Sequence, residues 1–130
     1  MSKPNILYIN SHDTGRFIQP YGWPVCTPNF QRLAEEGVLF RQMFSMGPTC
    51  SPSRAALLTG QCPHNAGMNG NVGRGWSLKD YNRHILHHLR AHGYSSALFG
   101  MQHIAPRADQ IGYDYVAPVD SKRVKDVAPP

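Results

Sequence analysis

The chain has 130 residues and a formal net charge of +5. That length suits one small domain with a buried core, and the sequence contains no apolar run long enough to cross a membrane. The positive charge suits an anionic ligand or a weak nucleic-acid binder. The three cysteines are an odd number without CxxC spacing, which argues against a disulfide framework or a zinc knuckle, so Cys26 and Cys62 are expected to be plain thiols.

The first predicted element is a buried strand over Asn5–Ile9, a short run of apolar and branched residues. It delivers the polar stretch Ser11–Gly15, with His12 and Asp13, to its carboxyl end. Open α/β sheets bind their ligands at that end of the strands. A lone aspartate after a strand is also a common turn or helix cap, so its position alone leaves both interpretations open.

The next residues predict a helix and a short strand. Pro28 begins the helix, Thr27 caps it and Gly37 ends it. Val38–Phe40 and Met43–Phe44 have the pattern of a short strand and its continuation. The apolar residues of the helix share one face and are expected in the core, as are those of the strand; on the helix they are Phe30, Leu33 and Ala34.

The stretch Cys50–Arg54 places a thiol at the N-terminus of a predicted helix, and Leu58–Gly60 ends that helix. Ser51 suits the N-cap, so the predicted helix runs from about residue 52 to residue 59 and ends at a left-handed glycine. Arg54 lies one turn after the thiol and therefore on the same side. The unpaired N–H groups and the positive end of the helix dipole favour an anion there. Helix capping alone requires neither the cysteine nor the arginine.

The stretch that follows this helix, Pro63–Trp76, ends in a glycine-rich segment and is predicted to be a loop. Within it, Arg74 is suited to a sulfate or carboxylate group and Trp76 to stacking on a ring. We assign Arg74 and the preceding His64 to substrate binding. A surface loop whose glycines serve only turns is the alternative.

Tyr81–His92 has apolar residues at helical spacing and is predicted to be an amphipathic helix that ends at Gly93. The apolar run Tyr94–Phe99 then predicts a strand, and a helix followed by a strand is typical of parallel sheets. Three histidines of this helix are one turn apart, at positions 84, 88 and 92. Without a third ligand type or an HExxH pattern, they are expected to form a solvated face rather than a metal site.

The fixed positions of Cys50–Arg54 and Leu58–Gly60 match the signature of formylglycine-dependent sulfatases, Cys-x-Pro-x-Arg followed by Leu-Thr-Gly. The chain resembles the N-terminal part of that family, which implies an alkaline-phosphatase-like α/β/α sandwich with a mostly parallel sheet. Residues 1–117 are then the N-terminal part of a catalytic domain, and residues 118–130 a polar tail. The resemblance also implies that a maturase oxidises Cys50 to formylglycine, with Arg54 steadying the aldehyde hydrate. One hydroxyl of the hydrate attacks sulfur and the other is deprotonated to expel sulfate, a step that plain serine lacks.

The resemblance also assigns the metal ligands. In sulfatases the first strand ends in an Asp-Asp pair that holds a divalent cation, usually calcium. Asp13 matches the second aspartate and His12 occupies the first position, while the oxygen of the modified Cys50 is a third expected ligand. Calcium prefers oxygen, whereas imidazole suits zinc, copper, nickel or iron. His12 therefore either contacts a ligand instead of the metal or indicates a metal other than calcium, and magnesium, which also prefers oxygen, is a further alternative.

Sulfatases carry Gly-Lys-x-His at the place of Gly100–His103. His103 matches the histidine, which implies that it contacts the sulfate or protonates the leaving atom. Met101 stands where the lysine is expected, and methionine cannot neutralise a developing anion. The candidates for the missing charge are Arg54, Arg74 and Arg107.

The function implied by the resemblance is hydrolysis of a sulfuric ester or sulfamate on a sulfated sugar. Gly67–Gly70 most resembles the N-sulfoglucosamine (heparan N-sulfate) sulfohydrolase branch. Two alternatives stay open. One is a phosphoesterase or phosphonate hydrolase of the same superfamily. The other is a degenerate, non-catalytic domain, with His12 and Met101 in place of expected residues, that only binds sulfated glycan.

The sulfatase domain is several times longer than this chain, so we expect a fragment without turnover of its own, whose exposed sheet edges favour self-association. The expected partners are a sulfated small molecule or sugar and the maturase. Nucleic acid is not expected, because the one dense basic group, Lys122, Arg123 and Lys125, lies in the tail without interleaved aromatic residues and is explained by solvation. A membrane is not expected, because no apolar run is long enough to cross it. Met1–Pro4 leads into the first strand without a signal peptide, which favours the cytoplasm; a periplasmic or secreted protein stays open if the gene model is partial.

Overall fold

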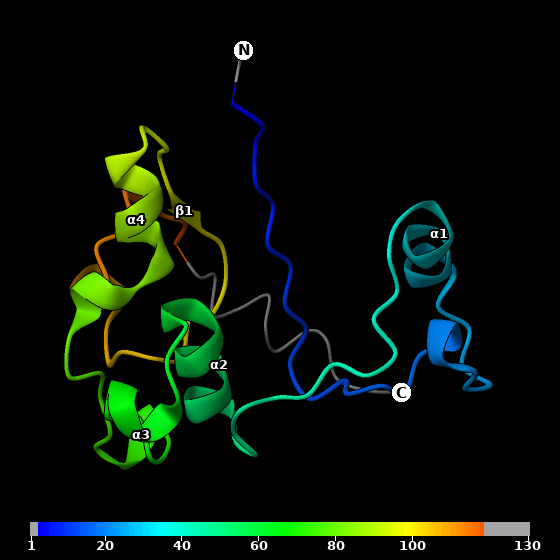
Figure 1. The fold of residues 1–130 in the computed structure, drawn as a ribbon, viewed down its shortest axis with the longest axis horizontal. Helices are drawn as coiled ribbons and strands as arrows, with labels where there is room; N and C mark the ends of the chain where they lie inside the picture. Colours follow the sequence, from blue (N-terminus) through cyan, green and yellow to red (C-terminus); the bar gives the residue numbers. More distant parts are fainter. Residues whose placement is uncertain (1–2, 119–130) are drawn as a thin grey trace. The chain divides into compact units, whose positions relative to one another are not determined.

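The computed structural model describes residues 3–118 and divides the chain into two compact units, Met1–Phe44 and Ser45–Pro130 (Figure 1). The polar tail predicted over residues 118–130 falls, after residue 118, outside the described residues, and so does its basic group. Among residues 3–118, no helix combines the length and the apolar character that a bilayer crossing requires.

The first unit contains the short 3₁₀-helix η1 (Gln19–Tyr21) and the helix α1 (Pro28–Glu36). Thr27 occupies the N-cap and Gly37 the C-cap of α1, which confirms the predicted ends of this helix. The hydroxyl of Thr27 does not cap the helix. It accepts a hydrogen bond from the Gln19 N–H at 3.0 Å, and the Thr27 N–H donates to the Gln19 side chain at 3.3 Å. This reciprocal pair fixes η1 to the start of α1.

The strands predicted in the first unit are absent. Residues 5–9, 38–40 and 43–44 have no strand assignment among the described residues. Their apolar side chains are largely exposed, Leu7 and Phe44 at 83% each, and the apolar face of α1 is open as well, with Leu33 58% exposed. The prediction that these residues form a core is therefore wrong for this structure. A strand needs a neighbour for its N–H and C=O groups, and no strand lies beside these runs within residues 3–44.

The second unit begins with three helical segments. They are α2 (Cys50–Thr59), the single turn α3 (Pro63–Ala66) and the 3₁₀-helix η2 (Val72–Arg74). The loop predicted over Pro63–Trp76 is thus partly helical, because Pro63 begins a turn that the left-handed Gly67 ends. Helix α2 starts two residues before the predicted start, with Thr49 in the N-cap position, so the prediction that Ser51 caps it is wrong. Its predicted end is confirmed: Gly60 is left-handed, with φ 66°, and its N–H donates to the Ala56 carbonyl at 2.9 Å.

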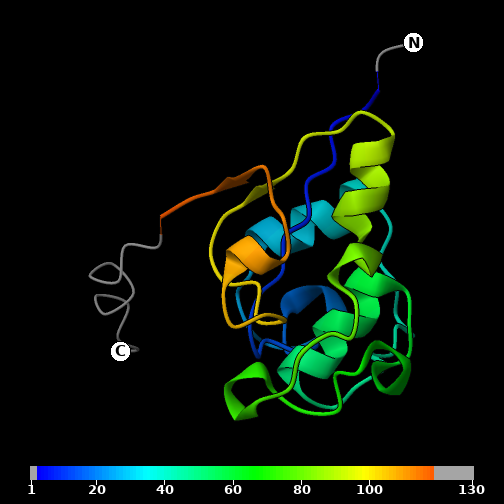
Figure 2. The ribbon, with the colours of Figure 1, turned by 90° about the vertical axis from the view of Figure 1, so that its left-hand side faces the viewer.

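The rest of the second unit contains two short strands that pair in parallel. The elements are η3 (Tyr81–Arg83), α4 (Ile85–Ala91), β1 (Ala97–Leu98), η4 (Ala108–Gln110) and β2 (Tyr115–Val116). Ala97 pairs with Tyr115 and Leu98 with Val116. Figure 2 follows the chain from β1 through η4, the orange helix, to β2. The strand predicted over residues 94–99 is thus real but only two residues long.

A carboxylate fixes the base of this strand pair. Asp114 accepts hydrogen bonds from the N–H of Ser96 at 2.7 Å and from its hydroxyl at 2.8 Å, and Arg90 donates to the same carboxylate at 2.7 Å. The N–H and hydroxyl of Ser96, followed by the guanidinium of Arg90, lower the pKa of Asp114. Together these bonds join α4, the segment before β1 and the segment before β2.

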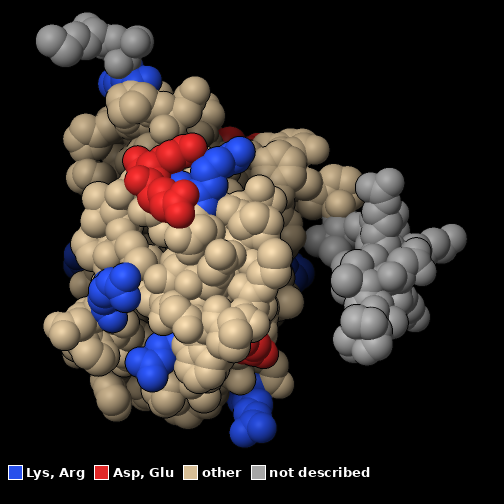
Figure 3. Space-filling view, turned by 90° about the vertical axis from the view of Figure 1, so that its right-hand side faces the viewer, with Lys and Arg blue, Asp and Glu red and all other residues tan. Residues whose placement is uncertain are grey.

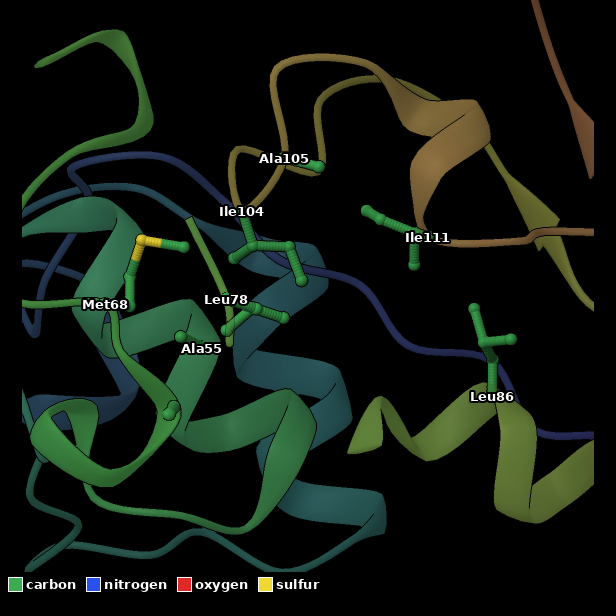
Figure 4. Packing of buried hydrophobic residues seen from close by; sticks show 8 residues of the cluster. Ala55, Met68, Leu78, Leu86, Ile104, Ala105 and Ile111 are labelled. Atoms are coloured by element: carbon green, nitrogen blue, oxygen red, sulfur yellow. The ribbon is translucent and has the colours of Figure 1, made fainter. Parts of the chain in front are cut away.

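The core of the second unit is one cluster of buried side chains (Figure 4). They come from α2, α3, α4, the segment between α3 and η3, and the segment between β1 and β2, which explains how such short elements hold together. The cluster comprises Ala55, Ala66, Met68, Leu78, Leu86, Ile104, Ala105 and Ile111.

His84 interrupts the helix predicted over residues 81–92 and is buried, with 2% of its surface exposed. Its Nδ1 accepts the Leu86 N–H at 3.1 Å, so the imidazole is the N-cap of α4, and its Nε2 lies 3.5 Å from the Tyr113 hydroxyl. The prediction of a solvated histidine face is therefore wrong at this position. Burial, with a smaller contribution from the charge of His87, lowers the pKa of His84 to about 4.

This buried cap predicts a pH-dependent stability. Between pH 4 and 6.5 the unfolded chain binds more protons at His84 than the folded chain, so the free energy of unfolding rises with pH and levels off above 6.5. We expect a gain of about 2 kcal/mol across this range after solvent screening. Urea midpoints at several pH values measure it. His84→Asn, a non-titrating N-cap, should flatten the slope, whereas His88→Asn on the exposed side of α4 should not; an unchanged slope in His84→Asn contradicts the assignment.

Candidate active site

Two of the predicted site residues lie together in the second unit. Cys50 is the first residue of α2, and His103 lies in the loop that follows β1. The Cys50 sulfur and a ring nitrogen of His103 are within 4.8 Å of each other. Cys50 is a free thiol and both side chains are half-buried. A group bound at the thiol is therefore within reach of the imidazole.

The first turn of α2 is fixed by the glycine-rich segment. Ser51 is fully buried. Its N–H donates to the Asn71 side-chain carbonyl at 3.2 Å, and its hydroxyl accepts the Val72 N–H at 3.1 Å. Gly47 packs closely against the first turn of α2, where a Cβ on residue 47 would lie only 2.9 Å from the Cβ of Pro52. Cys50 is thus presented from a turn that cannot shift independently of the loop after α3.

Arg54 joins the same helix to the loop that carries His103. Its Nη1 donates to the backbone carbonyl of Met101 at 3.2 Å. The arginine therefore approaches the residue that stands where a sulfatase lysine is expected, although it reaches the backbone of Met101 rather than its side chain. The Met101 side chain itself is 60% exposed.

The His103 loop is held by a residue that the sequence analysis missed. His103 has a φ of 55°, which is uncommon for a residue with a Cβ. The Gln102 amide spans the turn: its oxygen accepts the N–H groups of Ile104 at 2.6 Å and Ala105 at 2.8 Å, and its nitrogen donates to the Ala105 carbonyl at 2.6 Å. These three bonds compensate for the left-handed backbone. An amide side chain next to the candidate histidine was the available signal.

We expect Gln102→Ala to loosen this turn. The loss of three hydrogen bonds exposes the Ile104 and Ala105 amides to solvent, so their hydrogen exchange should accelerate by about tenfold or more. Exchange measured by NMR or mass spectrometry tests this. Gln61→Ala, in a turn outside this loop, is the matched control. Equal protection in both variants would show that the Gln102 amide does not hold the turn.

The predicted metal ligands His12 and Asp13 lie in the first unit. Nδ1 of His12 is 3.0 Å from a carboxylate oxygen of Asp13, and the two side chains are 39% and 81% exposed. Asp13 has a left-handed φ of 55°. The exposed carboxylate fits a divalent cation, whereas a calcium site built only of oxygen ligands has no place for the imidazole. This donor pair alone suits a metal that accepts nitrogen as well as oxygen.

The remaining predicted residues lie on the surface of the second unit. His64 and Arg74 are exposed. Trp76 packs against Gly70, where a Cβ would lie 2.4 Å from the indole nitrogen. Arg107 is bound by both oxygens of Asp109, at 3.0 and 2.9 Å, so a carboxylate already compensates its charge. Of the three candidates for the missing cation, Arg107 is therefore the least suited.

Comparison with known proteins gives consistent matches. A family model described as Sulfatase matches residues 4–126. The chain is 43% identical over 68 residues to an ulvan-active sulfatase of Formosa agariphila, covering 52% of this chain and 11% of that protein. It is 37% identical to N-acetylgalactosamine-6-sulfatase of Sus scrofa, covering 80% of this chain and 22% of the relative. It is 38% identical to arylsulfatase D of Homo sapiens, covering 87% and 22%. No solved structure gives a significant match.

Proposed function

This chain belongs to the sulfatase family, and on that premise we propose that it carries the nucleophile of a sulfuric ester or sulfamate hydrolase. The observation that carries the proposal is the approach of Cys50 and His103 within 4.8 Å at the start of α2. Family membership confirms the predicted fold class, the alkaline-phosphatase-like α/β fold, with which the parallel pair β1–β2 agrees. The chain spans 11% to 22% of the length of the three relatives, so the activity of the whole protein is itself part of the proposal.

In the proposed reaction Cys50 acts after oxidation to formylglycine. The hydrated aldehyde supplies an oxygen nucleophile and a second hydroxyl whose deprotonation expels the sulfate. The positive end of the α2 dipole lies at that position and favours an oxyanion. The N–H groups of Ser51 and Ser53 are already bonded to Asn71 and Thr49, so the dipole rather than these donors supplies the attraction. In this proposal His103 protonates the leaving atom or contacts a sulfate oxygen. Arg54 supports it by bonding the His103 loop at the Met101 carbonyl.

The proposed metal ligands are Asp13, His12 and the oxygen of the modified Cys50. A divalent cation bound there would act as a Lewis acid and neutralise sulfate oxygens. Calcium is the metal that the family resemblance favours, and the imidazole of His12 supports a nitrogen-accepting metal as the alternative. The carboxylate of Asp13 fits either one.

Sulfated sugar is the proposed substrate class, with Arg74 and His64 as binding residues. Both side chains are exposed and therefore accessible to a ligand. The assignment to the N-sulfoglucosamine branch rests on Gly67–Gly70 alone. Met68 is fully buried in the core, so packing explains part of that motif. The two mammalian relatives are named N-acetylgalactosamine-6-sulfatase and arylsulfatase D, and these names favour a sulfate ester over a sulfamate.

The remaining proposals concern partners and location. We propose a formylglycine-generating maturase as a partner and the cytoplasm as the location. Nucleic acid is not a proposed partner: on the face shown in Figure 3 the Lys and Arg side chains form separate patches rather than one continuous basic surface. Exposed apolar side chains such as Leu7 and Phe44 support self-association of the isolated 130 residues.

Mass spectrometry of the tryptic peptide that holds Cys50 tests the proposal. In the native host, or after co-expression with a maturase, the peptide is expected to have exchanged its thiol for an aldehyde. The peptide that contains Cys62 is the internal control, because it lies outside the signature and should keep its thiol. A thiol at position 50 under both conditions contradicts the hydrolase and favours the non-catalytic glycan-binding alternative. Turnover of an aryl phosphate in preference to an aryl sulfate favours the phosphoesterase alternative.

A further inference from the structure

The first unit contains a hollow that the proposed reaction does not use. Its volume is about 550 Å³, within the range of pockets that hold small ligands. Every lining residue belongs to the first unit: Arg16, Tyr21, Gly22, Trp23, Pro24 and Arg41. We call it the Arg16–Arg41 hollow. Two arginines and a tryptophan that line one hollow are a combination that neither the fold nor the Cys50 chemistry requires.

The walls of the Arg16–Arg41 hollow are held in place. The Tyr21 hydroxyl donates to the Phe40 carbonyl at 3.1 Å, which fixes the residue before Arg41 against η1. Gly22 ends η1 with a φ of 87°, and its N–H donates to the Gln19 carbonyl at 2.8 Å. The indole of Trp23 stands edge-to-face against Phe17, with ring centroids 4.7 Å apart. One wall is thus an aromatic surface of defined orientation.

The two arginines of the hollow carry charge without a protein counterion. Across residues 3–118 neither Arg16 nor Arg41 makes an ion pair or a side-chain hydrogen bond. Other arginines of the chain have acidic partners, as Arg32 has Glu36 at 3.9 Å and Arg107 has Asp109 at 2.9 Å. Two uncompensated guanidiniums on one concavity attract an anion, and their planar donor pairs match the oxygens of sulfate or carboxylate.

We propose that the Arg16–Arg41 hollow binds an anionic sugar residue, with its sulfate or carboxylate between Arg16 and Arg41 and its ring against Trp23. The choice of a sugar rather than another anion rests on the proposed sulfatase function. The apolar face of a sugar ring stacks on an indole, and its charged substituent takes the guanidinium donors. The hollow is then a binding subsite distinct from Arg74 and His64, built entirely within the first unit.

Binding of a defined probe tests this subsite. The probe is a heparin-derived tetrasaccharide, titrated into the full protein with Cys50→Ala so that no cleavage occurs, and followed by calorimetry and tryptophan fluorescence. Arg16→Ala and Arg41→Ala should each weaken binding by about tenfold, and the lysine replacements by less, because lysine keeps the charge but loses the two-pronged geometry. Trp23→Phe should weaken binding and reduce the fluorescence change. Arg32→Ala is the matched control, and circular dichroism shows that each variant is folded.

Several outcomes overturn the proposal. Equal binding of the desulfated tetrasaccharide removes the role of the anion, and equal binding of inorganic sulfate removes the role of the sugar. Equal binding of a short single-stranded oligonucleotide shows a generic polyanion surface. Unchanged affinity in both the Arg16 and Arg41 variants places the probe elsewhere. Turnover of 4-nitrophenyl sulfate by the wild-type protein tests the proposed function separately, because that ester contains no sugar.

Discussion

Cys50→Ala is expected to abolish hydrolysis of sulfate esters by the full protein, with a loss in kcat on the order of 10⁵. The variant removes the side chain at the N-terminus of α2 that is proposed to become the formylglycine nucleophile. It leaves the buried contacts of the first turn intact, because these are made by Ser51 and not by its neighbour. Turnover of 4-nitrophenyl sulfate by maturase-treated protein measures the effect.

Two further variants sharpen this prediction. Cys62→Ala, at an exposed thiol, should retain full activity and controls for the loss of a cysteine as such. Cys50→Ser should give one turnover at most and accumulate a stable sulfate ester on the new hydroxyl, because serine lacks the second hydroxyl that expels sulfate. Intact-mass spectrometry detects that adduct. Undiminished turnover in Cys50→Ala would remove position 50 from the mechanism.

His103→Asn is expected to lower kcat by a factor of about 10² to 10⁴, the range for removal of a general acid. Asparagine tolerates the left-handed backbone of this position, where φ is 55°, so the turn held by Gln102 should persist. The effect should depend on the leaving group. A substrate with a poor leaving group, such as a sugar sulfate, needs its proton and should suffer more than 4-nitrophenyl sulfate.

A comparison of variants separates chemistry from structure at this loop. His88→Asn, an exposed histidine of α4, is the control for the substitution itself. Gln102→Ala disturbs the turn without removing the imidazole, so its loss should be similar for both substrates. If His103→Asn affects both substrates equally, His103 positions the sulfate and does not act as the general acid.

The helices of the chain could be predicted from the sequence, because their caps are local. Thr27 and Gly37 bound α1, and Gly60 ends α2, each through hydrogen bonds or backbone angles within a few residues. The start of α2 was placed two residues late. Ser51 is a residue type that favours the N-cap. Its hydroxyl instead accepts the Val72 N–H and its backbone N–H donates to the Asn71 side chain, about twenty residues away, which no local rule foresees.

The strands could not be predicted in the same way. Asn5–Ile9 has strand composition, yet a strand exists only beside a partner, and pairing depends on residues distant in sequence. β1 has such a partner in β2 and forms, whereas residues 5–9 have none within their unit and remain exposed. His84 is the complementary case. Its spacing predicts a solvated helix face, but in the structure His84 is buried and its imidazole caps α4.

The link between Ser96 and Asp114 makes the loop between the strands an Ω-like excursion. Its ends are 18 residues apart in sequence and are tied by two hydrogen bonds to a single carboxylate. These bonds close the loop at its two ends and so reduce the number of conformations available to the residues between Ser96 and Asp114, including His103. A substitution at Asp114 should therefore loosen the position of the His103 imidazole, eleven residues away, without changing any proposed substrate-contacting residue.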